Sequence, residues 1–420
     1  MKTIQVIVLS GGNGNLLYPL TETTCKPLLP IANKPLIAYV LELLQRHHLV
    51  DITIVVNNKI KAKVQSYLDE TFEGKPKVDS QIKLFSPKED VSMVQSIAEL
   101  YATGAITRDV LLLYGDLLSN CNLFELLERH FAYESDITVG FNESKNSSLA
   151  VFVDKKESQI VKISTSDTLN SVGAKFRVPL VQAHPELSVL TKYSLARIFV
   201  LKPRALRLLS ELNTDLFNFS EDWLPFIVDH QLSSKLLSIY HQTSSTSSPL
   251  ASEAHNSNLA QLQIKPFFFG PAFHQRVTNV QEYRQLNIDI SKSLSKPEPP
   301  LPLTPNNTKC ETGPLNPNAK VFSSLISEGV EIGDGAKITG CFIGAGTIIG
   351  KNSVVVESFI GEGSQVGENC KVEKSTIGSG VVMVAKCELV LSVIGDGYIL
   401  QKSEQLNDET RARVADGDSG

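Results

Sequence analysis

Short apolar runs alternate with amphipathic segments along the N-terminal part of the chain. Each apolar run has the length of one buried strand, and each amphipathic segment repeats its apolar positions at helical spacing. The pattern predicts strands at 4–9, 52–56, 110–114, 137–141 and 196–201, and helices at 36–44, 93–103, 123–130, 205–212 and 221–230. Strands that alternate with helices in this way form a mostly parallel sheet that helices cover on both faces. We therefore expect an α/β domain.

Beyond residue 318 the pattern changes to aliphatic residues that recur at steps of five, six and six positions, so that it returns every 17 residues. The register consists of Val321, Ile326, Ile332, Ile338, Ile343, Ile349, Val355, Ile360, Val366, Val372, Ile377, Met383, Leu389, Ile394 and Leu400. A period of this length indicates stacked coils, none of which can bury its apolar edge alone. The pattern resembles the hexapeptide repeats of left-handed parallel β-helices. Each inward aliphatic then contributes about 1.5–3 kcal/mol when fully buried.

Polar and proline-rich stretches divide the chain between and after these patterns. Residues 241–260 are rich in Ser and Asn and lack periodicity, which is typical of a mobile insertion. Residues 293–318 contain seven prolines and are expected to form an extended linker. The polar residues 401–420 are expected to form a disordered tail. The predicted organisation is an α/β domain over 1–292, a linker over 293–318 and a β-helix over 319–400.

The composition narrows the class of protein. A chain of 420 residues can bury two sizeable cores, and 42% hydrophobic residues with a net charge of −5 suit a soluble protein without a general attraction to nucleic acid or membrane. No segment approaches the ~20 apolar residues of a membrane span, and the N-terminus lacks the core of a signal peptide. Six cysteines without CxxC spacing favour a reducing compartment, so we expect the cytosol.

The stretch from residue 9 to residue 35 carries the candidate chemistry. The strand at 4–9 runs directly into Gly11, Gly12 and Gly14, and glycines let backbone N–H groups approach phosphate oxygens closely. Lys26 stands in a segment stiffened by prolines and could meet a phosphate as a point charge. Asp116 follows the strand at 110–114, at the strand end where parallel sheets bind their ligands. These five residues are the predicted nucleotide pocket.

This stretch resembles the signature of the sugar-nucleotide pyrophosphorylases, a nucleotidyltransferase superfamily, through Gly-Gly-x-Gly, Pro19-Leu20-Thr21, residues 26–30 (KPLLP) and residues 33–35 (NKP). The resemblance implies a nucleotidyltransferase-like, Rossmann-type domain in which Asp116 matches the first metal-binding Asp. Other positions depart from the family. Leu16 replaces an Arg, Cys25 replaces a Pro, and Arg276 stands where the second metal-binding Asp belongs.

The family's glycine-rich base-contact segment is also absent, because residues 90–100 contain no glycine. Losing a single transition-state donor typically costs about 3–4 kcal/mol of catalysis. We therefore expect a degenerate site with no catalytic residue, no metal and at most weak nucleotide binding. An acyltransferase that uses a coil-borne His is also disfavoured, since the last histidine, His274, precedes the repeats. His47 and His48 are expected to be surface or capping residues, and Cys341, Cys370 and Cys387 small fillers of the β-helix core.

A pyrophosphorylase-like domain, a linker, a hexapeptide β-helix and a lost catalytic set together resemble the gamma and epsilon subunits of eukaryotic translation initiation factor 2B. Residues 184–202 and 275–287 favour the gamma type, as does the absence after the β-helix of the helical-repeat domain that performs exchange in epsilon. The resemblance implies a noncatalytic subunit that pairs with epsilon, within a complex that also holds alpha, beta and delta, to promote GDP/GTP exchange on initiation factor 2. The alternatives are an active sugar-1-phosphate nucleotidyltransferase, such as a GDP-mannose pyrophosphorylase, or the regulatory subunit of one.

Overall fold

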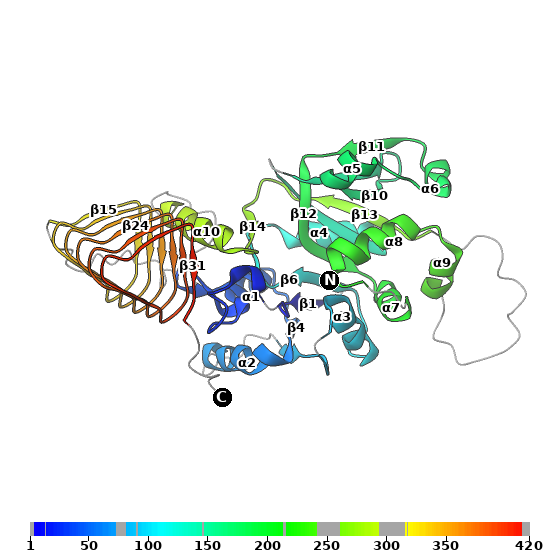
Figure 1. Cartoon of the computed structure of the whole chain (residues 1–420). Coiled ribbons are helices and arrows are strands. Elements are labelled where there is room, and N and C mark those ends of the chain that lie inside the picture. Colours follow the sequence, from blue (N-terminus) through cyan, green and yellow to red (C-terminus); the bar gives the residue numbers. More distant parts are fainter. Residues whose placement is uncertain are drawn as a thin grey trace, which may run out of the picture. The chain divides into compact units, whose positions relative to one another are not determined.

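The chain divides into two units, each of which is considered by itself. The computed structural model describes residues 4–12, 14–72, 81–89, 91–144, 147–212, 216–241, 261–293, 316 and 318–413 (Figure 1). The first unit comprises Met1–Gly12, Leu41–Gly115 and Cys121–His274, and the second comprises Asn13–Val40, Asp116–Asn120 and Gln275–Gly420. No helix within the described ranges is long and apolar enough to cross a membrane.

A seven-stranded sheet forms the centre of the first unit. Its strands lie in the order β13 (Ile264–Phe268), β8 (Ile137–Glu143), β12 (Tyr193–Leu201), β6 (Val110–Tyr114), β1 (Gln5–Leu9), β4 (Asp51–Val55) and β5 (Gln81–Phe85). Strand β12 is antiparallel to β6 and β8, while the other neighbours pair in parallel. Every residue of β6 is buried, as expected of a strand that is covered on both faces. The prediction of a mostly parallel α/β sheet is confirmed.

Helices accompany this sheet, and local signals in the sequence explain where several of them begin. They are α1 (Leu36–Arg46), which crosses the division between the units, α2 (Asn58–Phe72), α3 (Met93–Ala102), α4 (Leu123–Ala132), α7 (Pro203–Glu211), α8 (Leu224–His230) and α9 (Ser234–His241). Ser92 and Gln95 form a capping box at α3, and the Asn122 side chain caps α4. Sequence periodicity alone did not indicate α2 or α9.

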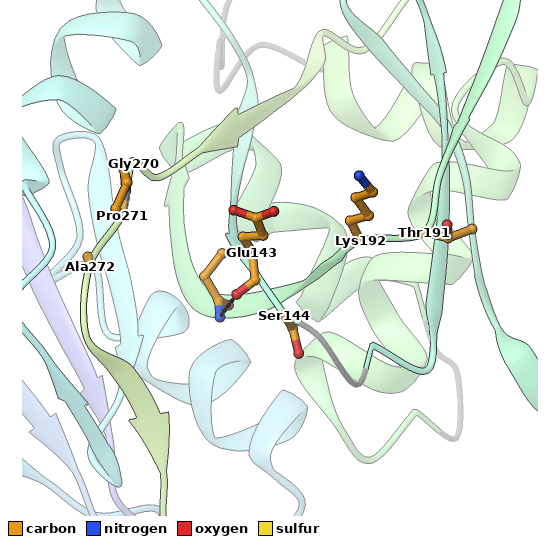
Figure 2. Close-up of a pocket in the computed structure, with 8 residues that line it drawn as sticks. Glu143, Ser144, Thr191, Lys192, Gly270, Pro271 and Ala272 are labelled. Carbon is orange, nitrogen blue, oxygen red and sulfur yellow. Dashed lines mark hydrogen bonds between the residues drawn. The ribbon is translucent and has the colours of Figure 1, made fainter.

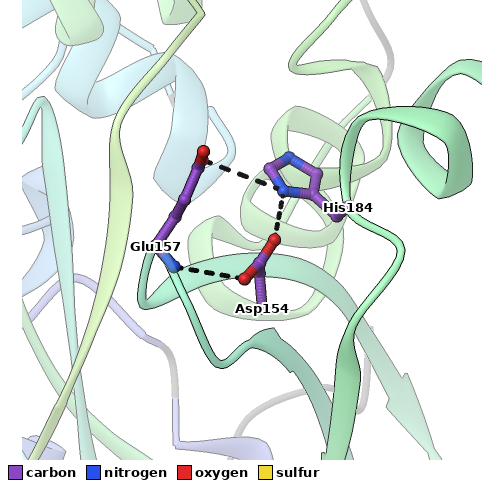
Figure 3. Close-up of side chains that lie close together, drawn as sticks. All are labelled: Asp154, Glu157 and His184. Atoms are coloured by element: carbon purple, nitrogen blue, oxygen red, sulfur yellow. Dashed lines mark hydrogen bonds and ion pairs between the residues drawn. The ribbon is translucent and has the colours of Figure 1, made fainter.

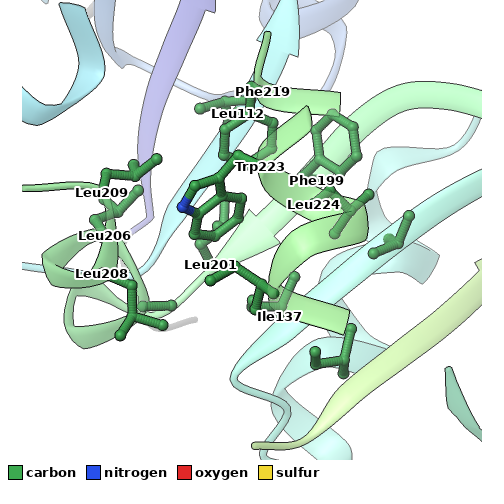
Figure 4. Close-up of a cluster of buried hydrophobic side chains, with 14 of the residues drawn as sticks. Leu112, Ile137, Phe199, Leu201, Leu206, Leu208, Leu209, Phe219, Trp223 and Leu224 are labelled. Carbon is green, nitrogen blue, oxygen red and sulfur yellow. The ribbon is translucent and has the colours of Figure 1, made fainter. Parts of the chain in front are cut away.

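The core of this unit surrounds the single tryptophan. A single helix was expected at 221–230, but Trp223 ends a π-helical turn, η3 (Phe219–Trp223), that leads into α8. Its ring is fully buried and stacks on Phe219 with the ring centroids 4.7 Å apart. Figure 4 shows Leu112 of β6 and Phe199 of β12 in the same cluster. The π-helical turn therefore places two large rings over the sheet.

A second, three-stranded sheet in the first unit was not predicted. Its order is β10 (Gln159–Thr165), β9 (Leu149–Asp154) and β11 (Leu187–Leu190), with antiparallel pairing throughout. Two short helices, α5 (Ser166–Val172) and α6 (Val178–Ala183), connect β10 to β11. Both strand pairs involve β9, so β9 is the central strand of this small sheet.

The second unit begins inside the glycine-containing signature, of which it contains Gly14 and the residues that follow. It contains the 3-10 turns η1 (Asn15–Leu17) and η2 (Lys26–Leu28), the short strands β2 (Pro30–Ile31) and β3 (Lys34–Pro35), the strand pair β7 (Leu117–Ser119) and β14 (His274–Arg276), and the helix α10 (Val280–Ser293). Asn287 of α10 accepts a hydrogen bond from the Ala32 N–H at 2.9 Å, and Tyr283 donates to the Pro30 carbonyl at 2.7 Å. Helix α10 thereby holds the turn that follows Lys26.

The C-terminal repeats form three parallel sheets (Figure 1, yellow to red). The first contains β15 (Lys320–Phe322), β18 (Lys337–Thr339), β21 (Val354–Val356), β24 (Lys371–Glu373), β27 (Glu388–Val390) and β30 (Gln405–Asn407). The second contains β16 (Leu325–Ile326), β19 (Phe342–Ile343), β22 (Phe359–Ile360), β25 (Thr376–Ile377), β28 (Val393–Ile394) and β31 (Thr410–Arg411). The third contains β17 (Glu331–Ile332), β20 (Ile348–Ile349), β23 (Gln365–Val366), β26 (Val382–Met383) and β29 (Ile399–Leu400).

The 17-residue register is confirmed by the strand pairing. Ile360 lies opposite Ile377, and both side chains are fully buried. Every aliphatic of the predicted register is buried apart from the half-buried Val321 and Ile332 at the first coils. Cys341, Cys370 and Cys387 are buried in the same core, as predicted.

One boundary of the β-helix was predicted wrongly. Residues 401–413 were expected to belong to a disordered tail, but β30 and β31 add a further partial coil. Leu406 lies opposite Leu389, one period further on, and is buried, which gives this segment an apolar anchor. Residues 414–420 lie outside the described residues, as do nearly all residues of the expected insertion at 241–260 and of the expected linker at 293–318.

Candidate functional site

Of the three predicted phosphate-loop glycines, Gly14 is the one whose own backbone requires glycine. It has φ 71°, and a Cβ there would lie 2.8 Å from Cγ2 of Thr21. The Thr21 hydroxyl also donates to the Gly14 carbonyl at 3.0 Å, which closes the loop on itself. A Cβ on Gly11 would make only an ordinary contact, and one on Gly12 would meet open space. Gly14 is therefore a structural turn residue, whatever else this loop binds.

Lys26, Asp116 and Arg276 come together in the second unit. The Lys26 Nζ lies 2.6 Å from Asp116 Oδ2. Arg276 donates two hydrogen bonds to the same carboxylate, from Nε to Oδ1 at 2.9 Å and from Nη2 to Oδ2 at 2.8 Å. The side chains of Lys26, Asp116 and Arg276 are 16%, 10% and 22% exposed. We call these three residues the Asp116 cluster.

Local structure explains how the Asp116 cluster forms. Lys26 begins the turn η2, whose Pro27 fixes the backbone of its first residues. Asp116 immediately precedes β7, and Arg276 ends β14, the strand that pairs with β7. The Val277 N–H also donates to the Asp116 carbonyl at 3.2 Å. The strand pair therefore sets Arg276 beside Asp116, although 160 positions separate them in the chain.

Charge and burial act in opposite directions on the Asp116 carboxyl. Burial by itself raises the pKa of an acid, because it disfavours the charged form. The Arg276 guanidinium and the Lys26 ammonium outweigh that effect and hold the pKa of Asp116 below its ordinary value. Asp116 is therefore ionised at neutral pH, and the three side chains carry two positive charges against one negative charge.

The Asp116 cluster does not fit the Mg²⁺ ion that the pyrophosphorylase resemblance implies. Mg²⁺ needs carboxylate oxygens, but both oxygens of Asp116 already accept hydrogen bonds from cations. A metal ion would have to displace Arg276 and then lie beside its positive charge. The excess of positive charge suits an anion better.

The other residues that the sequence singled out, Leu16, Cys25 and His47, lie in different surroundings. Leu16, which stands where the family has an Arg, is 72% exposed, and Cys25 is buried. His47 pairs with the Leu43 carbonyl through Nδ1 and accepts a hydrogen bond from the Leu123 N–H at Nε2. His47 thus caps α4 and has a structural role, as expected.

The first unit contains a hollow that the sequence did not indicate. It has a volume of about 620 Å³ and is lined by residues 142–144 at the end of β8, residues 191–192 before β12 and residues 270–272 after β13. Figure 2 shows the charged side chains of Glu143 and Lys192 among the residues that line it. The Ser144 N–H donates to the Lys192 carbonyl at 2.8 Å, which joins two of its walls. No pattern in the sequence links these three separate segments.

Comparison with known families divides the chain in the same order as its fold. Residues 5–152 match the family model described as Nucleotidyl transferase. Residues 306–404 match the model described as GMPPB C-terminal domain, and most of the β-helix lies within that match. The chain thus contains a region similar to the nucleotidyl transferase model, followed by a region similar to the GMPPB C-terminal domain model.

Over most of its length the chain is similar to translation initiation factor eIF2B subunit gamma, which confirms the predicted resemblance. The protein of that name from Dictyostelium discoideum is 24% identical over 383 residues, which cover 78% of this chain and 83% of the relative. The one from Schizosaccharomyces pombe is 25% identical over 301 residues, which cover 68% of this chain and 65% of the relative.

A shorter match concerns an enzyme. A bifunctional sugar-1-phosphate nucleotidylyltransferase/acetyltransferase from Sulfurisphaera tokodaii is 32% identical over 130 residues, which cover 30% of this chain and 29% of the relative. The chain therefore spans less than a third of the length of that protein.

Proposed function

We propose that this chain is a noncatalytic subunit of translation initiation factor 2B, of the gamma type. In this proposal it pairs with the epsilon subunit in the cytosol, in a complex that also contains alpha, beta and delta, and promotes GDP/GTP exchange on initiation factor 2. The long matches to two gamma subunits support this assignment. Neither membrane nor direct nucleic-acid binding is part of the role.

The Asp116 cluster carries the noncatalytic part of the proposal. Nucleotidyl transfer stabilises negative charge on phosphate with Mg²⁺ and cationic side chains. Here Arg276 stands where a second metal-binding Asp belongs, and it neutralises the Asp that remains. If the fold is retained without a place for the metal ion, its role is best explained as the binding of other proteins through its surface.

The vestigial pocket of Gly11, Gly12, Gly14, Lys26 and Asp116 enters the proposal as a weak, metal-independent nucleotide site. Because both oxygens of Asp116 are engaged, Mg²⁺ should not strengthen the binding of a nucleotide. Calorimetry with GTP, ATP and GDP, with and without Mg²⁺, tests this point. Binding that requires Mg²⁺ would contradict it, and absence of heat at millimolar nucleotide would mean that the loop is only a structural turn.

The second candidate is an active sugar-1-phosphate nucleotidyltransferase, or the regulatory subunit of one. The two family-model matches and the Sulfurisphaera tokodaii relative favour it. The active enzyme should release pyrophosphate from GTP or UTP in the presence of sugar 1-phosphates, and it should lose this turnover in Asp116→Ala. The proposed subunit should stay at background in the same assay.

Co-expression tests the proposal directly. We expect the chain alone to self-associate or to be poorly soluble, and co-expression with the epsilon subunit to yield a soluble complex that co-purifies through a tag on either chain. A parallel co-expression with a GDP-mannose pyrophosphorylase catalytic subunit distinguishes the regulatory alternative. A stable complex with that subunit, and none with epsilon, would overturn the assignment.

A further inference from the structure

We infer that Asp154, Glu157 and His184 of the first unit form a binding site for a transition-metal ion of the Zn²⁺ type, remote in sequence from the Asp116 cluster. One ligand atom from each residue lies within 4.8 Å of the other two. Figure 3 shows both carboxylates directed at the same nitrogen, Nδ1 of His184. Asp154 Oδ2 is 2.8 Å from this nitrogen and Glu157 Oε2 is 4.0 Å from it.

The backbone of the three-stranded sheet positions two of these ligands, Asp154 and Glu157. Asp154 is the last residue of β9, and Glu157 lies in the turn that leads to β10. Oδ1 of Asp154 accepts hydrogen bonds from the N–H groups of Lys156 at 2.8 Å and Glu157 at 3.1 Å. One carboxylate oxygen therefore fixes the turn, which leaves Oδ2 directed at His184. His184 follows α6 and is 1% exposed, so its ring is held in place.

The separations suit a small metal ion after a modest adjustment. Tetrahedral Zn²⁺ with bonds of about 2.0–2.1 Å separates its ligand atoms by about 3.3 Å. The 2.8 Å pair would open slightly and the 4.0 Å pair would close. Glu157 can make that movement because its side chain is 54% exposed, while Asp154 at 5% exposed stays fixed. Water would supply the fourth ligand. The mixture of one imidazole and two carboxylates favours Zn²⁺ over Mg²⁺.

The second layer of residues also suits the site. Gln261 Nε2 lies 2.9 Å from Nε2 of His184 and 3.1 Å from Oε1 of Gln231, so it donates to both, and the ring proton sits on Nδ1. When a metal ion binds Nδ1, that proton leaves to solvent and a proton is taken up on Nε2. The Gln261 amide then turns so that its oxygen accepts the new N–H, as outer partners of metal-bound histidines do. The imidazole of His184 therefore stays neutral, because it loses one proton from Nδ1 and gains one on Nε2.

One nearby cation opposes metal binding. Lys265 donates through Nζ to the Glu157 carbonyl at 2.7 Å. Its ammonium group therefore lies beside the turn that carries the Asp154 and Glu157 carboxylates. Because the ammonium and the metal ion would share those carboxylates, Lys265→Met should bind Zn²⁺ several-fold more tightly. A purely structural His184–Asp154 hydrogen bond predicts no such gain.

The test is a Zn²⁺ titration of the full-length chain, in its complex if a partner is needed for solubility, after chelator treatment and dialysis. A chromogenic chelator competes for the metal. Wild type should bind one equivalent, Glu157→Gln should bind at least about 10-fold more weakly, and His184→Gln should lose the site. Glu128→Gln is the matched control, because it removes the same charge from an exposed position on α4.

A second His–Asp pair, in which the histidine is buried, provides a control for the histidine variant. His130 Nε2 lies 3.6 Å from Asp109 Oδ2, and these two residues belong to no group of three metal-binding side chains within the described residues. His130→Gln should therefore bind Zn²⁺ as wild type does. If His184→Gln does not fold, Glu157→Gln and Lys265→Met decide the matter, since both positions are accessible. Absence of Zn²⁺ binding by wild type, or equal affinity in wild type and Glu157→Gln, would overturn the inference.

Discussion

Arg276 holds both carboxylate oxygens of Asp116, with Nε 2.9 Å from Oδ1 and Nη2 2.8 Å from Oδ2. A planar guanidinium that binds a carboxylate in this bidentate way gives a strong and directional ion pair. Arg276, which stands where the pyrophosphorylase resemblance implies a second metal-binding Asp, thus binds Asp116 itself. In the proposed noncatalytic subunit, this internal ion pair fills the position where the pyrophosphorylase resemblance implies a metal ion.

Removing Asp116 alone should cost more stability than removing Asp116 and Arg276 together. Arg276→Gln leaves the Asp116 charge with Lys26 alone, and we expect a loss of about 1–3 kcal/mol in the free energy of unfolding. The double variant Asp116→Asn/Arg276→Gln should be more stable than Asp116→Asn, because Asp116→Asn leaves Lys26 and Arg276 as neighbouring unpaired cations and the double variant leaves only Lys26. Urea unfolding of the four proteins gives the coupling.

The exposed pair Lys371–Glu388 serves as the control for this experiment. Its atoms lie 2.8 Å apart, but the side chains are 49% and 40% exposed, so Lys371→Gln should change stability little. Additive losses from Asp116→Asn and Arg276→Gln would contradict the account of the Asp116 cluster.

The depressed pKa of Asp116 predicts where its contribution to stability disappears. An unfolded Asp has a pKa of about 3.9, and the folded value is lower. The stabilisation is therefore fully present above about pH 3.9 and is lost as the pH falls through the folded pKa. The stability difference between wild type and Asp116→Asn should be constant from pH 7 to pH 5 and shrink only in stronger acid. A difference that already narrows between pH 7 and pH 5 would argue against this ion pair.

The sequence predicted the members of the Asp116 cluster but not the contacts between them. The signature motif identified Lys26, the end of the strand at 110–114 identified Asp116, and the family pattern indicated that Arg276 stands at a metal-binding position. The direct Arg276–Asp116 bond could not be predicted, because it depends on the pairing of β7 with β14 across a long separation in the chain. The same holds for His184, which lies 30 positions from Asp154.

A charge placed inside the β-helix should prevent its folding. Ile360 is fully buried and stacks on Ile377 of the next coil, so Ile360→Asp loses apolar contacts and buries a carboxylate without a partner. We expect a loss of more than about 3 kcal/mol and hence little soluble protein. Lys351→Asp in the same coil is the matched control, and it should be nearly neutral because this side chain is exposed. Equal soluble yields of the two variants would refute the register.

The β-helix was the most predictable part of the chain. Its register follows from one repeated requirement, an aliphatic residue at each inward position, and that requirement is local to each coil. The prediction ended too early because the last partial coil keeps only part of the pattern. Leu406 continues the aliphatic series, but Glu404 stands where a small residue is usual, and Arg411 replaces the next inward aliphatic.

The β-helix cysteines should be unreactive in the folded protein. Burial raises the pKa of the Cys341 thiol to about 11. At pH 8 only about 1 thiol in 1,000 is then the reactive thiolate. Iodoacetamide followed by peptide mapping should label Cys341 after denaturation and leave it unlabelled before. Rapid labelling of Cys341 in the native protein would show that this part of the core is open.

We propose that the chain acts through the epsilon subunit and not through chemistry of its own. The most direct measurement is the rate at which labelled GDP leaves initiation factor 2 in the presence of epsilon alone, of this chain alone, and of the two together. The account predicts faster release with the pair than with epsilon alone, and no release above background with this chain alone. We also expect the pair formed with Arg276→Lys, which keeps the positive charge but not the bidentate contact, to keep the acceleration. An unchanged rate with the pair, measured with material that is folded and monodisperse, would contradict the account.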